Sequence, residues 1–592
     1  MPFFIAYFVG LAVVIIGVIT FMRTDNREKK ASVRLLVFLF VAVTVWYIPL
    51  ETSQGIYTVP EAILSAVLQG VAALKADSYT KETVSSPLVS SLFSFSIMAV
   101  RIIILFFIFD MAISLIGVPH QYINNWLKRK CPTVVFCGLN EKTLSIAESM
   151  NEKDKKRIIY ISHDSPDTAQ REKLKNFGGI YFTRPLGYVF RHLLKDKRAD
   201  AVEVFIFGET DADNMACLSE LADAVRNDKF RQVRAYVELN ETSDTIQKNI
   251  QNRYLSLKKL IISFVNTEED FAYNNLYEND FLKYAAEENG RKIIKALFIG
   301  TDRISVGMIK SALWLFQLPG YRLSMEVVSS GEFLPEFRYA CPEIREDVDL
   351  SGMAEYHMGI HDNVGYRTEQ FAVLMKSFCD FTFAFVNTGD DMLNYNIAAD
   401  LIMFRRRAGI RDECTIQLRN DRPSVISDTG DKLWKYVKIA GTKNELYSYS
   451  YLTNAAIENA ARMIHEERQL TKEETERTPW SEYCRDDYKK RSAYVRALSI
   501  KYKLSVLCRD FEAEYSLLET DETWMKYEHM RWSVYTLTEG YIYSEIMDTL
   551  IGKTHPLLIP FDAINDKKIR LKNAISVSND LAEKLLKGAK YI

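Results

Sequence analysis

The sequence lacks the motifs that mark most enzyme active sites. It contains no GxSxG, HExxH or Walker A motif, and no cysteine and histidine pair in a usable context. Aspartate and glutamate are plentiful, yet they form no recognisable acid–base constellation. Hydride transfer would require an intact glycine-rich turn, which this chain does not have. We therefore predict that the protein is not an enzyme and has no catalytic residues.

Paired cysteines and an excess of one charge are also absent. The eight cysteines are scattered, without a CxxC pair or a His–Cys cluster at metal-binding spacing, and all of them follow residue 130. We expect neither disulfides nor a metal site, and these thiols suit a reduced cytosol. The formal net charge is only −2, which argues against a general nucleic-acid-binding surface.

Long hydrophobic runs occur in the first 130 residues. Residues 3–22 are apolar over about the length that crosses a bilayer, residues 35–50 form a second apolar run, and the third, 87–119, is longer than necessary and would have to tilt or project past the interface. Basic clusters lie between the first two runs and after the third, and such clusters stay on the cytoplasmic side. We therefore predict a transmembrane domain at residues 1–130, with three membrane-spanning helices in the cell (inner) membrane. Its N-terminus would lie outside, and the large C-terminal part would be cytoplasmic.

Two features of this region indicate a pore. Residues 56–74 are apolar, and a full crossing there would put the basic clusters on opposite sides, so we predict a re-entrant or interfacial helix. Arg101 and Asp110 lie within the third run, where a charge must face protein or water. They are the candidate pore residues of a homo-oligomer; the alternative for Arg101 is snorkelling or a structural pairing with Glu51 or Glu61. No TVGYG-like filter follows, so selective potassium conduction lacks its expected chemistry.

Strand-like and helix-like segments alternate from residue 131 to about residue 450. This alternation predicts an α/β fold with doubly wound parallel sheets. The pattern occurs twice, so we expect two tandem domains, at residues 131–292 and 293–450, with residues 240–292 as a connector. The corresponding segments are 133–147 with 296–312, and 204–225 with 383–403.

The segment VFIFGETDADNMACLSELADAV at 204–225, together with the strand, turn and helix at 133–147, resembles the TrkA-N/RCK domain family. Domains of this family have a Rossmann-like fold and sit beneath potassium channels and transporters. The resemblance implies a pair of lobes that gate a membrane assembly.

Nucleotide binding by these lobes would depend on their glycine turns, which let the backbone approach a pyrophosphate at a helix N-terminus. The first copy has Gly138, followed by Asn140 and Thr143 where two further glycines belong, and Asp164 lies where a ribose could be bound. In the second copy Asp302 would repel phosphate. Gly138, Asn140 and Asp164 are thus the candidate cofactor-binding residues. The alternative is a scaffolding or dimerisation role, and the sequence establishes no cofactor.

Residues 451–592 carry a different signature, made of a charged box, an aromatic step and a His-Pro tail. In order, these are Glu528-His529-x-Arg531-Trp532, Gly540-Tyr541 and Lys553-x-His555-Pro556 through Pro560. The three elements resemble the RyR repeat, a small α-helical module named from ryanodine receptors and also found in bacterial proteins. Segments 455–470 and 479–497 resemble the other half of the same repeat. The resemblance implies an RyR-like domain that accepts a nucleotide.

The spacing of residues in this region also indicates a ligand site. Aromatic residues and Arg531 recur at three- and four-residue steps from Trp524 to Tyr535, so one helical face presents rings and a guanidinium. Such a face suits a flat anionic ligand. The alternative is that the rings are the domain's own core and that Glu528 and Arg531 form a local ion pair. The candidate ligand-binding residues are Trp480, Arg491, Tyr527, Glu528, His529, Arg531, Trp532, Tyr541, Lys553 and His555.

Combined, these features predict a ligand-gated membrane effector or ion channel. Its cytosolic RCK-like and RyR-like domains would sense a small anionic ligand, with the lipid bilayer as a partner and no nucleic acid. By analogy with bacterial RyR-like modules, the ligand would be a nucleotide second messenger in anti-phage defence. The alternatives are a potassium transport or osmotic regulator of the RCK type, and a non-conducting membrane-anchored scaffold.

Overall fold

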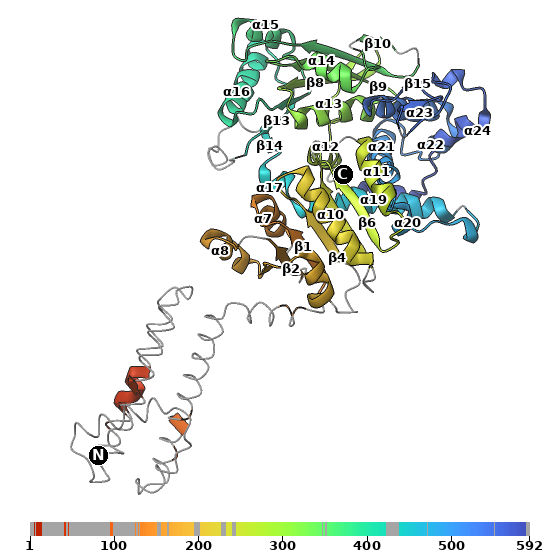
Figure 1. Ribbon diagram of the computed structural model, residues 1–592. Coiled ribbons are helices and arrows are strands. Elements are labelled where there is room, and N and C mark those ends of the chain that lie inside the picture. The colour runs from red at the N-terminus through yellow and green to blue at the C-terminus, as the bar shows by residue number, and fades with distance from the viewer. Residues whose placement is uncertain are drawn as a thin grey trace, which may run out of the picture. The chain divides into compact units, whose positions relative to one another are not determined.

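Figure 1 shows the computed structural model of the chain. It divides into two compact units, Met1–Leu127 and Lys128–Ile592, and the second contains almost all of the described residues. The structure describes residues 131–587 without 151–155, 163–164, 195–201, 227–231, 240–243, 346, 350–351, 422–436, 471 and 550; before residue 131 it describes 5, 8–14, 41–42, 45, 91, 95–96, 98, 125 and 128.

Within the described residues, no helix is long and apolar enough to cross a membrane. This finding corrects the predicted fold class, in which three transmembrane helices preceded the α/β domains. A spanning helix needs about 20 consecutive apolar residues, whereas the longest described stretch of the N-terminal unit is 8–14. Most of the three predicted spans, the predicted re-entrant helix at 56–74, and the predicted pore residues Arg101 and Asp110 lie outside the described residues.

The first α/β unit contains a six-stranded parallel sheet with the order β3-β2-β1-β4-β5-β6. Its strands are short runs in which nearly every residue is buried, as in TVVFC of β1 and LIISFV of β6. Runs that are apolar on both faces are typical of a parallel sheet covered by helices on both sides. The strands are β1 (Thr133–Cys137), β2 (Arg157–Ile161), β3 (Ile180–Phe182), β4 (Val202–Ile206), β5 (Val233–Glu238) and β6 (Leu260–Val265). The helices are α7 (Glu141–Glu148), α8 (Thr168–Asn176), α9 (Leu186–Tyr188), the π-helix Val189–Leu193, α10 (Asp211–Arg226) and α11 (Asp244–Tyr254).

The second α/β unit repeats this topology. Its parallel strands have the order β11-β9-β8-β12-β13-β14, which is again third, second, first, fourth, fifth and sixth along the chain, while β10 and β7 pair antiparallel with β11 and β8. The predicted α/β fold with parallel sheets is therefore confirmed. The strands are β7 (Ala286–Glu288), β8 (Arg291–Ile299), β9 (Tyr321–Val328), β10 (Asp347–Asp349), β11 (Glu355–His361), β12 (Phe383–Val386), β13 (Thr415–Arg419) and β14 (Val437–Ala440). The helices are α12 (Thr267–Glu278), which precedes the sheet, α13 (Arg303–Leu315), α14 (Phe333–Ala340), α15 (Glu369–Ser377) and α16 (Asp391–Arg407).

The remainder of the chain is mostly helical. Short polar residues cap its long helices; the Asp486 side chain, for example, accepts a hydrogen bond from the Lys489 backbone N–H at the start of α21. The helices are α17 (Lys443–Leu446), α18 (Tyr449–Leu452), α19 (Ala455–Leu470), α20 (Trp480–Tyr483), α21 (Asp487–Asp510), α22 (Leu517–Thr520), α23 (Glu522–Thr538), α24 (Lys567–Arg570) and α25 (Asn579–Lys587), with 3-10 turns at Glu474–Glu476, Phe561–Ala563 and Leu571–Asn573. A small parallel pair, β15 (Ile542–Tyr543) and β16 (Thr554–His555), follows α23.

One apolar core joins the second α/β unit to these C-terminal helices. Trp314 of α13 meets Tyr535 of α23 edge to face, with ring centroids 6.0 Å apart. Phe316 meets Tyr502 of α21 in the same way at 5.8 Å. These side chains belong to a single cluster of buried residues that extends along the sequence from α12 to α25. The C-terminal helices therefore share most of their core with the second α/β unit.

A tyrosine-rich segment, residues 441–454, attaches the first α/β unit to the rest. The Tyr447 hydroxyl donates to Glu238 at the end of β5 over 3.3 Å. The Tyr449 hydroxyl donates to Glu203 of β4 over 2.8 Å. Because these bonds reach two neighbouring strands, the segment lies along the first sheet and links it to the second unit and to the C-terminal helices.

Candidate functional site

The glycine turn of the first α/β unit is closed by its own side chains. Gly138 follows β1 with a φ of +100°, and Asn140 caps α7. The Asn140 Oδ1 accepts from the Thr143 N–H over 3.0 Å, and its Nδ2 donates to the Phe207 carbonyl over 2.6 Å. The predicted cofactor residues Gly138 and Asn140 thus lie together, but Asn140 takes a helix N–H group that would otherwise face a phosphate. Asp164 lies outside the described residues.

The corresponding turn of the second unit is filled by a carboxylate. Asp302 caps α13, where its Oδ1 accepts from the Ser305 N–H over 2.9 Å. Its Oδ2 accepts from Arg419 Nη1 over 2.8 Å, and Asn387 donates to the same carboxylate. A negative charge therefore occupies the helix N-terminus, where a dinucleotide site binds phosphate. In both turns a side chain of the protein already takes a helix N–H group that would face a phosphate, and nucleotide binding there stays a prediction.

Gly300, at the start of this second turn, should not tolerate a side chain. Its φ is +90°, and a Cβ there would lie 1.7 Å from the Asn387 carbonyl oxygen. We expect Gly300→Ala to lower the free energy of unfolding by roughly 3 kcal/mol, measured by denaturant unfolding. Gly320→Ala is the matched control, because Gly320 has a φ of +79° but no atom within 4 Å of its Cβ position. Equal losses in the two variants would show that the contact with Asn387 has no effect.

The predicted ligand residues Glu528 and Arg531 are buried and paired with each other. Arg531 donates from Nε and Nη2 to the two carboxylate oxygens of Glu528, each over 3.0 Å. Lys503 of α21 pairs with the same carboxylate, and the exposed fractions of the three side chains are 0% for Lys503, 6% for Glu528 and 5% for Arg531. Burial alone would raise the pKa of Glu528, but Arg531 and Lys503 hold it well below its usual range. The local ion pair that the sequence analysis gave as the alternative is present within α23. The additional bond from Lys503 joins α21 to α23.

His529, Trp532 and His555 pack on one another next to this ion pair. Trp532 lies 4.8 Å from His555 and 5.7 Å from His529, measured between ring centroids. His529 Nε2 lies 2.8 Å from the Ile559 carbonyl, which can only accept, so this nitrogen donates. Burial lowers the pKa of His529, which favours the neutral ring. This part of the predicted site forms internal contacts of the C-terminal helices.

Tyr527 and Trp480 lie away from these residues. The Tyr527 hydroxyl donates to Glu355 of β11 over 3.2 Å, which ties α23 to the second sheet. Trp480 stacks on Tyr483 with centroids 5.6 Å apart and donates from Nε1 to Glu458 over 3.4 Å. Neither residue lines the cavity described next, and their roles as ligand residues stay predictions.

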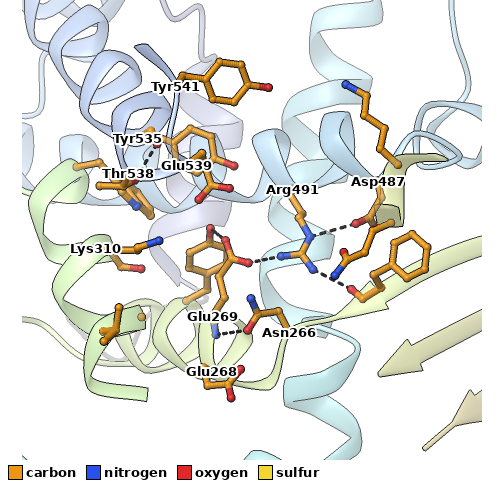
Figure 2. A pocket seen from close by; sticks show the side chains of 18 of the residues that line it. Asn266, Glu268, Glu269, Lys310, Asp487, Arg491, Tyr535, Thr538, Glu539 and Tyr541 are labelled. Atoms are coloured by element: carbon orange, nitrogen blue, oxygen red, sulfur yellow. Dashed lines mark hydrogen bonds and ion pairs between the residues drawn. The ribbon is translucent and has the colours of Figure 1, made fainter. Parts of the chain in front are cut away.

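The remaining three predicted ligand residues, Arg491, Tyr541 and Lys553, line one cavity of about 410 Å³. It lies where the first α/β unit, the second α/β unit and the C-terminal helices meet, and we call it the junction cavity (Figure 2). Its walls come from α11, the end of β6, α12, α13, α21, the end of α23 and the loop that follows α23. Three parts of the molecule that are distant in sequence, the two α/β units and the C-terminal helices, therefore form one site.

Arg491 of α21 is fixed at the wall of this cavity. Its Nη1 pairs with Glu269 of α12, its Nε with Asp487 over 3.1 Å, and its Nη2 donates to the Phe264 carbonyl over 2.9 Å. Figure 2 shows these bonds as dashed lines. Burial alone would lower the pKa of Arg491, but Glu269 and Asp487 raise it well above its ordinary value. The Tyr273 hydroxyl donates to Glu269 as well, so this wall is held in place before any ligand arrives.

Helices α12 and α13 approach each other closely beside the cavity. A Cβ on Gly307 of α13 would lie 3.0 Å from the Glu268 carbonyl oxygen, so glycine permits this approach. The same helix presents Arg303, Lys310 and Trp314 to the cavity. Figure 2 shows the Lys310 side chain pointing from α13 into the cavity. Burial raises the pKa of Glu268 on the facing helix, which makes this carboxylate easier to protonate.

The last wall contains the end of α23 and the loop after it. The Lys553 ammonium donates to the Glu539 carbonyl over 2.8 Å. The Tyr541 hydroxyl and the Lys248 ammonium of α11 both donate to the Thr549 carbonyl, over 3.4 and 3.1 Å. This loop thus connects the C-terminal helices to α11 of the first unit across the cavity.

The described residues that line the junction cavity include five lysine or arginine residues and four aspartate or glutamate residues. Arg491 is engaged with Glu269 and Asp487. The other cations are Lys248, Arg303, Lys310 and Lys553, and the other carboxylates are Glu268 and Glu539. Such a lining suits a small ligand with an anionic group and several hydrogen-bonding groups. Among the described residues, no group of three or more His, Cys, Asp or Glu side chains could hold a metal ion.

Arg491, Tyr541 and Lys553 were named from the sequence and line this cavity, whereas its α12 and α13 side was not predicted. Residues 240–292 were expected to be a connector, yet they contain α11, β6 and α12. The signal that would have revealed them is the buried run LIISFV followed by Asn266, whose side chain caps α12.

A scan against protein-family models finds no match to this chain, and a search of curated proteins finds no significant match either. The resemblances to the TrkA-N/RCK family and to the RyR repeat therefore stay predictions.

Proposed function

We propose that residues 128–592 form a sensor that binds a small anionic ligand of the nucleotide class in the junction cavity. The main supporting observation is that each of the three parts around the cavity contributes a cation to it: Lys248 from α11, Lys310 from α13 and Lys553 from the loop after α23. A ligand that contacts all three cations binds one arrangement of the three parts more tightly than the others. Binding then shifts the population toward that arrangement, and this shift is the signal.

The aromatic residues of the cavity favour a ligand with a flat group. Trp314 lies edge-on to both Tyr273 and Tyr535, with centroids 6.0 Å apart in each pair. A nucleobase can pack against such rings, while the cations bind its phosphate. The carboxylates of Glu268 and Glu539 can accept hydrogen bonds from ribose hydroxyls or amino groups. A nucleotide has all of these groups in one small molecule.

The process that this sensor controls stays a prediction from the sequence. Residues 1–127, which would respond to it in a membrane effector or ion channel of anti-phage defence, lie mostly outside the described residues. If the protein is a potassium transport or osmotic regulator instead, that role also stays a prediction from the sequence. A scaffold, in contrast, would bind no ligand in the junction cavity, so ligand titration separates a scaffold from a sensor.

Calorimetric titration of the full-length chain with cyclic and linear nucleotides tests the proposal. At least one nucleotide should bind, and Lys310→Glu should weaken that binding roughly tenfold or more, because an anion replaces a cation of the cavity. Lys567→Glu is the matched control, since it makes the same change at an exposed residue of α24 and should leave the affinity unchanged. The proposal fails if no nucleotide binds, or if folded Lys310→Glu protein binds as tightly as the unchanged chain.

A further inference from the structure

A second cavity, of about 550 Å³, adjoins the junction cavity along α11. We call it the outer cavity. The two cavities share Lys248 and Gln251 of α11 as lining residues. The other walls of the outer cavity are α19, the turn after it, and the segment from Glu482 to Lys489 around the start of α21. Figure 1 shows α11, α19 and α20 in the same region of the molecule.

Residues of two helical faces line this cavity. Each face uses positions separated by three, four and seven residues, which fall on one side of a helix. Only one of the eight side chains concerned is apolar, so the two faces cannot pack together as an ordinary helix interface does. They are Lys248, Gln251, Asn252 and Leu255 on α11 and the turn after it, and His465, Arg468, Gln469 and Lys472 on α19 and the turn after it.

The outer cavity is more basic than the junction cavity. The described residues that line it include five cations, Lys248, Arg468, Lys472, Arg485 and Lys489, and two carboxylates, Glu482 and Asp486. Five minus two leaves a surplus of three positive charges. A concave surface with a surplus of one sign concentrates ions of the other sign.

Two further features fit a ligand in this space. Arg485 lines the cavity, and because its Nη2 donates to the Leu255 carbonyl, its guanidinium is held at the cavity wall. His465 lies against Tyr483 with ring centroids 4.5 Å apart, and its Nε2 is 2.8 Å from the Thr478 carbonyl. Both rings line the outer cavity together with the basic side chains of α19 and those near α21, and their planes are tilted by 44°.

We propose that the outer cavity binds an oligophosphate, meaning a chain of phosphate groups that is either free or carried by a nucleotide. A phosphate chain carries several negative charges along its length, so it can contact cations on more than one wall. Arginine and lysine side chains bind such oxygens through charge-assisted hydrogen bonds. This site shares Lys248 and Gln251 with the junction cavity, but the proposal does not depend on the ligand proposed there.

Titration of the full-length chain with inorganic tripolyphosphate tests this proposal. We expect binding, and we expect Arg468→Glu to weaken it roughly tenfold or more because the substitution reverses a charge at the cavity wall. Arg462→Glu is the matched control on the same helix. Arg462 lies six residues earlier, about two thirds of a turn around α19, where it pairs with Glu466 at 4.0 Å and is not part of the cavity lining. Its substitution should leave the affinity for tripolyphosphate unchanged.

A second set of titrations identifies the source of the phosphate chain. Lys310→Glu protein should bind tripolyphosphate as tightly as the unchanged chain does. Because Lys310 lines only the junction cavity, equal affinity would show that tripolyphosphate does not bind there. If this variant binds ATP more tightly than it binds tripolyphosphate, the natural ligand carries its phosphate chain on a nucleotide. If it binds ATP equally or more weakly, the natural ligand is a free phosphate chain. Absence of tripolyphosphate binding, or equal losses in the Arg462 and Arg468 variants, would overturn the proposal.

Discussion

Replacing Glu528 by alanine should lower the free energy of unfolding by roughly 3–5 kcal/mol. Glu528 is the carboxylate between Lys503 and Arg531, and these side chains are at most 6% exposed. Its removal leaves two buried cations without a partner charge, which is far more costly than the loss of one exposed ion pair. A third cation depends on it as well, because burial lowers the pKa of Arg496 and the Glu528 carboxylate opposes that effect.

Denaturant unfolding near pH 7 measures this loss. Glu519→Ala, at an exposed acid of α22, is the control and should change the free energy of unfolding by less than about 0.5 kcal/mol. The effect should also depend on pH, because the folded pKa of Glu528 is depressed. Its contribution is complete above the unfolded pKa of about 4.3 and is lost as the pH falls toward the folded value. A loss at pH 7 as small as that of the control would mean that the cluster does not stabilise the α21 and α23 pair.

Asp270→Asn should stabilise the protein at pH 8 by up to about 4 kcal/mol and have little effect near pH 4. Asp270 lies on α12 and is 8% exposed. Burial raises its pKa to about 7, although Arg491 and a hydrogen bond from Asn454 oppose that change. The Asn454 Nδ2 donates to Asp270 Oδ1 over 2.6 Å, and an asparagine oxygen can accept the same bond.

The sign of this effect follows from the raised pKa of Asp270. Because the folded protein binds the proton more tightly than the unfolded chain, the contribution of this group is fully present below the unfolded pKa of about 3.9. It is lost as the pH rises through about 7, the folded pKa. The neutral amide of Asp270→Asn does not titrate, so the variant avoids that loss.

Denaturant midpoints at pH 5 and pH 8 would measure the difference between Asp270→Asn and the unchanged chain. The advantage of the variant should grow between these two values. Asp223→Asn serves as the control, because Asp223 is exposed and its ion pair is with Arg226 one turn away. A variant that is equally destabilised at both pH values would show that the carboxylate of Asp270 stabilises the fold in its charged form.

The parallel sheets could be predicted because their strands are continuous buried runs. TVVFC and RIIYI of the first unit are buried at every position, and such runs followed by capped helices indicate β-α units. The strand at residues 260–265 is also a continuous buried run. It was not predicted, because it lies outside the two repeated segments on which the prediction was based. The three predicted membrane-spanning helices are the part of the predicted fold class that was corrected, since no helix within the described residues is long and apolar enough to cross a membrane.

The candidate site was harder to predict than the sheets. Helical spacing correctly placed Glu528 and Arg531 one turn apart, but it could not show that Lys503 on another helix closes over them. Arg491 faces the junction cavity because Glu269 and Asp487 hold it there, and Glu269 lies more than 200 residues earlier in the chain. Contacts between elements this distant in sequence leave no local pattern that periodicity can detect.

The core that α12 and α13 share with the C-terminal helices limits how this chain can be divided. A protein that ended after β14 would expose Trp314 and Phe316 to water, because Tyr535 and Tyr502 cover them from the C-terminal side. For the same reason, a chimaera that grafted α19 to α25 onto another protein would have to include α12 and α13 to remain soluble.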